Sequence, residues 1–119
     1  LGISMIAVSE SFSMAEKLGL SAQNLFDITS SSSSQCWAMT SYLPVPGPVP
    51  ASPANNDYQP GFSGAMMAKD MKLARDAAIS SGQKTELADS ALQMYERFLA
   101  EGGSSKDFSA IYNMINNSS

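Results

Sequence analysis

The sequence contains no histidine and a single cysteine, and charged residues make up only 15% of its 119 residues. Without histidine, the chain lacks the usual acid–base side chain near neutral pH and a common metal ligand. Cys36 cannot form an internal disulfide and has no histidine to activate it, so nothing indicates an oxidising compartment. We therefore expect no metal site and no catalytic residue within this chain.

Positive charge is also sparse. The formal net charge is −4 and the seven Lys and Arg residues are scattered, whereas phosphate binding requires clustered cations. No apolar run approaches the 18 or so residues of a membrane span. The glycines at Gly61 and Gly64 lack the preceding strand of a dinucleotide fingerprint. We expect neither a nucleic-acid partner nor a membrane partner.

Hydrophobic residues are plentiful, at 44%, which together with the length predicts one folded domain over residues 1–119. The opening segment is apolar from Leu1 onward and has no initiating Met, basic leader or small-residue cleavage site. These features favour the back part of a longer protein.

Apolar residues recur at helical spacing, and no segment alternates with the period of a strand. A first helix is predicted over 1–18, ending at Gly19, and a second over 22–28, capped by Ser21. The apolar positions of the two helices are Ile3, Ile6, Ala7, Phe12, Met14, Ala15, Leu25 and Ile28.

Further helices are predicted beyond residue 63. One covers 64–81 and ends at Gly82, and the next is capped by Thr85 and ends before Gly102. The last begins at Ser104 or Ser105, with Asp107 in its first turn. Their inward positions are Leu87, Ala91, Met94, Tyr95, Phe98, Phe108, Ile111 and Ile115. The fold class is thus an all-α bundle of about five or six helices.

Two segments between these helices lack helical periodicity. The serine run 30–34 is either a flexible linker or a turn that leads into a short helix, and the apolar residues that follow it favour the turn. Residues 42–61 contain all six prolines and must form a loop. Because proline restricts the unfolded chain, we expect an ordered path anchored by Val45, Val49 and Tyr58.

The helix over 64–81 carries Lys69 and Asp70 side by side. Asp70 shares a helical face with Met66 and Leu73, so a core on that side would bury a carboxylate at a cost of several kcal/mol unless it has a partner or meets a polar cleft. Alternatively, both residues belong to a solvated surface. Phe62 and Trp37 are by default packing residues, and no complete catalytic constellation follows from composition and spacing.

Three stretches carry a family resemblance: SQCWAMTSYLPVPGPVP at 34–50, ANNDYQPGF at 54–62 and MMAKDMKLA at 66–74. They resemble the helical C-terminal domain of the β-hydroxyacid dehydrogenase family, whose fold is shared with 6-phosphogluconate dehydrogenases. The Lys-Asp pair, with a phenylalanine eight residues before its aspartate, resembles a pattern found across the wider family. The Cys-Trp pair followed by Tyr-x-Pro-Val-Pro-Gly resembles the 3-hydroxyisobutyrate dehydrogenase branch.

The resemblance implies specific roles for residues of this chain. It identifies Lys69 as the lysine that reaches NAD, Phe62 and Asp70 as residues lining the substrate end of the cleft, and Trp37 as a residue near them. It implies an N-terminal Rossmann domain that binds NAD, a homo-oligomer, and a 3-hydroxy acid substrate oxidised in valine breakdown. The implied compartment is the bacterial cytoplasm or the mitochondrial matrix.

The sequence also departs from the family pattern. The family's catalytic lysine lies in a Gly-x-Gly-x-x-x-Lys-x-x-Asn-Asn segment that nothing here matches, so the chain alone is expected to be inactive. Ser34 stands where the family often has glycine. Two alternatives stay open: a related dehydrogenase acting on tartronate semialdehyde, glyoxylate or succinic semialdehyde, and a non-catalytic helical association module.

Overall fold

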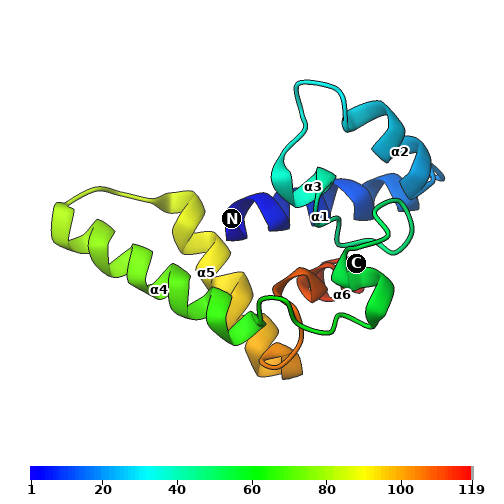
Figure 1. The fold of residues 1–119 in the computed structure, drawn as a ribbon. Coiled ribbons are helices and arrows are strands. Elements are labelled where there is room, and N and C mark those ends of the chain that lie inside the picture. Colours follow the sequence, from blue (N-terminus) through cyan, green and yellow to red (C-terminus); the bar gives the residue numbers. More distant parts are fainter. Residues whose placement is uncertain (119) are drawn as a thin grey trace.

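The computed structural model describes residues 1–118, and within that range it contains helices and no strand (Figure 1). This confirms the predicted all-α fold. The α-helices are α1 (Gly2–Lys17), α2 (Ala22–Thr29), α3 (Trp37–Thr40), α4 (Gly64–Ser81), α5 (Glu86–Phe98) and α6 (Ile111–Asn116). Short 3₁₀ segments cover Pro53–Asn56 and Phe108–Ala110, and a π-helical turn covers Leu99–Gly103. None of the helices in residues 1–118 is long and apolar enough to cross a membrane.

The long first helix organises the packing. Helix α1 contacts α2 and α3 as well as α5 and α6, while α4 runs antiparallel along α5. Figure 1 shows the α4–α5 hairpin projecting away from the part of the molecule that contains α2, α3 and α6. The principal extents, 43 × 30 × 27 Å, reflect this projection. One side of α4 therefore has no neighbour within the described chain.

The core lies where α1, α4, α5 and α6 meet. Its largest fully buried side chains are Tyr95, Phe108, Met5, Leu43, Leu92 and Ile111. Burying each large apolar side chain contributes about 1.5–3 kcal/mol. The Tyr95 hydroxyl donates to the Phe108 carbonyl at 3.2 Å, which satisfies the one polar atom this ring brings inside. The core thus joins the hairpin to the C-terminal helix.

Two helix starts are capped by a serine side chain, and the cap at Ser21 was predicted. The Ser21 Oγ accepts from Asn24 N at 3.1 Å, and the Ser63 Oγ accepts from Met66 N at 3.2 Å. Helix α4 ends at Gly82, whose φ of 76° lies in the left-handed region that glycine tolerates. Thr85 occupies the cap position of α5, but its side chain makes no capping bond, so that part of the prediction is wrong.

The C-terminal helix begins later than predicted. Asp107 is the N-cap of the 3₁₀ turn Phe108–Ala110, not a residue of a first helical turn that starts at Ser104 or Ser105. The physical reason is that the Asp107 side chain accepts from Ser109 N, which stops the helix from extending backward. Phe108 and Ile111 are buried and Ile115 is half-buried, as predicted.

The segments between helices are ordered as predicted. The serine run forms a turn that leads into α3. In the proline loop, Val45, Val49 and Tyr58 pack against the core, and the Tyr58 hydroxyl donates to the Pro44 carbonyl at 2.7 Å. The proline loop therefore packs with the core as a single unit.

Several apolar positions at helical spacing are not buried, and for Leu87 the predicted inward position is wrong. Ile3, Met14, Ile28 and Leu87 are exposed, with 40%, 62%, 65% and 74% of their surface accessible. Helix α1 is covered from more than one side, so its buried arc includes polar Ser9 and Ser13, which a hydropathy pattern does not identify.

Candidate functional site

A hollow of about 410 Å³ lies between the start of α1 and the α4–α5 hairpin. Asp70 is the only ionisable side chain among its otherwise mainly apolar lining. The lining residues are Leu1, Gly2, Ile3, Phe62, Met67, Asp70, Met71, Ala74 and Ala88. A mainly apolar hollow with one fixed polar group is a common form of small-molecule site.

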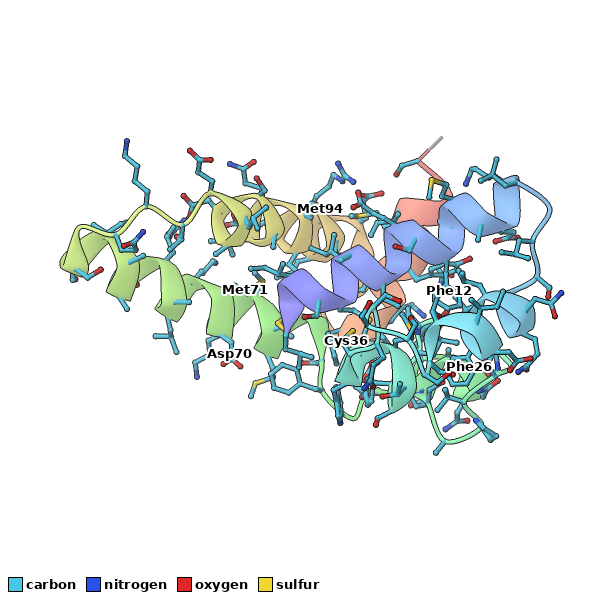
Figure 2. The ribbon with its side chains drawn as sticks, turned by 90° about the horizontal axis from the view of Figure 1, so that it is seen from above. Phe12, Phe26, Cys36, Asp70, Met71 and Met94 are labelled. Atoms are coloured by element: carbon cyan, nitrogen blue, oxygen red, sulfur yellow. The ribbon has the colours of Figure 1, made fainter. Side chains whose placement is uncertain are left out.

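The orientation of α4 decides between the surroundings that the sequence left open for Asp70. Met66 and Leu73, which share its face, are 47% and 58% exposed, so that side does not face the core. The buried side begins one residue later, with Met67 and Met71. Figure 2 shows Met71 on the side of α4 that faces α1 and Asp70 farther out. Asp70 is thus exposed and lies at the edge of the hollow, where its charge stays hydrated.

Lys69 is exposed and does not line the hollow. Within residues 1–118 its ammonium has no ion pair and no hydrogen bond to another side chain. A lysine in this state is a donor-only cation that an anion from outside the domain can reach. Lys69 therefore lies outside the hollow, one residue before Asp70 in α4.

Phe62 precedes α4 and is held from both sides. Its ring meets Phe108 edge-on, with ring centroids 5.8 Å apart and an interplanar angle of 80°. Its backbone carbonyl accepts from Phe108 N at 2.7 Å. The half-buried ring lines the same hollow as Asp70, so the structure brings these two predicted residues together.

Trp37 does not line the hollow, but it is linked to Phe62 through two other rings. Trp37 stacks on Tyr42 at 5.0 Å between ring centroids, and Tyr42 stacks on Phe108 at 5.2 Å. We call Trp37, Tyr42, Phe108 and Phe62 the aromatic row. Trp37 is 53% exposed at its outer end. Burial, together with a hydrogen bond to Asp107, raises the pKa of Tyr42 well above its usual value.

Sequence analysis missed the central role of Asp107, which is fully buried. Its carboxylate accepts from Gly61 N at 3.0 Å and from Phe62 N at 3.1 Å, and so ties the start of α4 to the C-terminal turn. The Asp-x-Ser spacing that ends at Ser109 is a signal for a local side-chain turn. Nothing in the sequence indicates the long-range bonds.

The described residues offer no phosphate cradle of the strand–loop–helix type, because residues 1–118 contain no strand. Lys69 and Lys72 of α4 are exposed and make no ion pair among the described residues.

Comparison with known proteins gives one consistent result. Residues 1–115 match the family described as the NAD-binding domain of NADP-dependent 3-hydroxyisobutyrate dehydrogenase. A probable 3-hydroxyisobutyrate dehydrogenase of Mycobacterium tuberculosis is 48% identical over 97% of this chain. A mitochondrial 3-hydroxyisobutyrate dehydrogenase of Drosophila melanogaster is 42% identical over 97%. The chain spans only 39% and 36% of the lengths of these two relatives.

Solved structures agree with the sequence matches. The M. tuberculosis 3-hydroxyisobutyrate dehydrogenase, solved with L-serine, superimposes with a TM-score of 0.93 over 97% of this chain and 39% of that protein, at 48% identity. A 3-hydroxyisobutyrate dehydrogenase of Salmonella typhimurium superimposes with a TM-score of 0.81 over 95% of this chain and 37% of that protein. At 21% identity, the second match speaks for the fold alone.

Proposed function

This chain belongs to the family of NAD-binding domains of 3-hydroxyisobutyrate dehydrogenases, and on that basis we propose that it closes the active-site cleft of such an enzyme. The proposed reaction is the NAD-dependent oxidation of 3-hydroxyisobutyrate to methylmalonate semialdehyde. The observation that carries the proposal is the 48% identity to the M. tuberculosis relative across almost the whole chain. The hollow that holds Phe62 and Asp70 supports it.

We assign the binding of the dinucleotide mainly to a Rossmann domain of the same protein. When bound, the nicotinamide supplies the acceptor for the hydride that leaves the alcohol carbon. Lys69 contributes a cation for a ribose hydroxyl or a phosphate of the cofactor. The hydroxyl proton goes to a lysine outside this chain, as the family resemblance implies.

Asp70 and Phe62 form the wall of the substrate site that this chain contributes. A hydroxy acid is an anion, and a second carboxylate beside it would be repulsive, so Asp70 faces donor groups and not the substrate carboxylate. Its oxygens accept hydrogen bonds and orient these donors. Phe62 covers apolar substrate atoms and excludes water. Trp37, at the outer end of the aromatic row, extends this wall when the cleft is closed.

The solved structure of the same relative supports the substrate class. L-serine, present in the M. tuberculosis structure, carries a hydroxyl on the third carbon of a carboxylic acid, as 3-hydroxyisobutyrate does. A hollow of about 410 Å³ also suits a molecule of this small size. We therefore place a short 3-hydroxy acid next to Phe62.

The partners we propose are the Rossmann domain and a second copy of the enzyme. Exposed large apolar side chains support contacts of this kind. Among the described residues they occur on five helices, as Ile3 and Met14 of α1, Ile28 of α2, Trp37 of α3, Met66, Leu73 and Ile79 of α4, and Leu87 of α5. Eukaryotic relatives are named mitochondrial, so the proposed compartment is the mitochondrial matrix in a eukaryote and the cytoplasm in a bacterium.

The test is a substrate comparison with the full-length protein. We expect NAD reduction with 3-hydroxyisobutyrate at a kcat/KM at least about tenfold above the values for the alcohols of tartronate semialdehyde, glyoxylate and succinic semialdehyde. A higher kcat/KM with one of these three would assign a related dehydrogenase instead. No turnover with 3-hydroxyisobutyrate or with any of the three alternative substrates would refute the enzymatic function and favour the non-catalytic association module.

A further inference from the structure

Asp107 is the most completely satisfied carboxylate among the described residues. It is 0% exposed, and its Oδ1 accepts three hydrogen bonds. The donors are the Tyr42 hydroxyl at 2.7 Å, Gly61 N at 3.0 Å and Phe62 N at 3.1 Å. A buried charge requires such partners, since its desolvation would otherwise cost more than the fold can offset.

The two oxygens of Asp107 have separate roles. Oδ2 accepts from the backbone and the hydroxyl of Ser109, and these bonds form the local cap of the 3₁₀ turn. Capping needs only that oxygen. Oδ1 instead reaches residues 45 to 65 positions away in sequence, so its bonds have no part in the cap.

The Oδ1 bonds act on the residues that lead into α4. Around them, Asp107 N donates to the Tyr58 carbonyl at 2.9 Å, and Gly64 N donates to the Lys106 carbonyl at 2.8 Å. A Cβ on Gly61 would lie 2.7 Å from the Tyr42 hydroxyl oxygen, so the segment has little room to shift. Phe62, the next residue, lines the hollow.

We propose that Asp107 is a positioning residue for the substrate wall: its Oδ1 fixes the backbone at 61–62 and thereby sets where the Phe62 ring and the first turn of α4 stand against the substrate. The inference rests on the proposed function, because it assigns Phe62 to the substrate. Asp107 touches neither the hollow nor any reacting atom. Its effect passes through Phe62 and through Tyr42 of the aromatic row.

The test compares Asp107→Asn with Ser109→Ala in the full-length protein. Asp107→Asn removes the charge that strengthens the bonds to 61–62, whereas Ser109→Ala removes an equally buried bond from the Oδ2 side only. We expect Asp107→Asn to lower kcat/KM for 3-hydroxyisobutyrate by about tenfold or more, with KM for NAD changed less than about twofold. Hydrogen exchange at the Gly61 and Phe62 amides should accelerate. Ser109→Ala should match the wild type in all three measurements.

Two results would overturn the proposal: unchanged kcat/KM in folded Asp107→Asn, or an equal loss in Ser109→Ala. If Asp107→Asn does not fold, Tyr42→Phe replaces it, since this change removes one donor and keeps the stacked ring. For Tyr42→Phe, a fall in kcat/KM that is smaller than the tenfold expected for Asp107→Asn, with the KM for NAD unchanged, supports the proposal. Wild-type kinetics in Tyr42→Phe overturn it. Failure of the proposed function itself would differ, because the wild-type protein would then not oxidise the hydroxy acid at all.

Discussion

Neighbouring residues of α4 have opposite surroundings: Met71 is buried, whereas Asp70 and Lys69 are exposed. Each residue turns a helix by about 100°, so a single position separates the core side from the side that faces a partner. The hollow lies on this boundary, with the buried Met67 and Met71 and the exposed Asp70 all in its lining.

Lys69 can be tested against another lysine of the same helix. Lys69→Ala in the full-length protein should raise the KM for NAD by about three- to tenfold, because it removes one charge-assisted hydrogen bond to the cofactor. Lys72→Ala is the matched control, since Lys72 is equally exposed and also lies outside the hollow. Steady-state kinetics with NAD varied give both values. Equal KM values for the two variants would contradict the role of Lys69.

Sequence information predicted some residues of the candidate site and could not predict others. The pairing of Phe62 with Asp70 was implied by family resemblance, and the structure places both on one hollow. Which side of α4 is buried stayed open in the sequence, because Met66 and Met67 are both apolar and only tertiary packing decides between them. Asp107 was missed because its bonds to Gly61 and Phe62 join segments far apart in sequence.

Among the elements, the start of α4 lies very close to the turn that follows α5. A Cβ on Gly64 would lie 2.6 Å from the Gly103 carbonyl oxygen and 2.7 Å from the Phe98 ring. The backbone bond from Ala65 N to the Ser104 carbonyl, at 3.2 Å, joins the same two segments. This approach anchors the base of the hairpin next to Phe62.

We predict that Gly64→Ala lowers the free energy of unfolding by about 1–3 kcal/mol, because backbone atoms must move to admit the methyl group. Gly2→Ala is the control. Its Cβ would lie 2.7 Å from the Met71 sulfur, a flexible side chain that can turn away. Urea unfolding of the two variants measures the difference, and an equal or larger loss for Gly2→Ala would contradict this account of the hairpin base.

The elements themselves were predicted well where local chemistry decides them. The predicted cap Ser21 and the predicted glycine stop at Gly82 act within one turn of chain, so the sequence is enough to locate them. The cap at Ser63 is equally local but was not predicted. The start of the C-terminal helix was misplaced, because Asp107 serves a long-range network there. The π-helical turn at Leu99–Gly103 was not predicted either, since it follows the close packing against Gly64.

At the scale of the whole molecule, all four tyrosines of the chain are packed so that their phenols stay neutral. Burial, as the leading cause, raises the pKa of Tyr58 to about 12 and raises the pKa of Tyr42, Tyr95 and Tyr112 further. The pKa of each tyrosine is thus higher in the folded chain than in the unfolded chain. The resulting stabilisation of the folded state is complete below about pH 10 and is lost as pH rises through the folded pKa values.

The expected result is a folded chain with little tyrosinate absorbance at about pH 10, where free tyrosine is half ionised. The free energy of unfolding should then fall as pH rises from about 10 to 12. Ultraviolet titration in parallel with urea unfolding measures both quantities. Half-ionised tyrosines in the folded chain at pH 10 would contradict the packing described for all four rings.

The central claim is that Asp70 and Phe62 form one wall of a hydroxy acid site, and the most direct measurement is kcat/KM of Asp70→Asn in the full-length protein. The account predicts that kcat/KM for 3-hydroxyisobutyrate falls by about tenfold or more, because the amide that replaces the Asp70 carboxylate has no negative charge with which to orient hydrogen-bond donors. Asp76→Asn, at an exposed acid on the same helix outside the hollow, should keep the wild-type value. Wild-type kcat/KM in Asp70→Asn, or an equal loss in both variants, would contradict the claim.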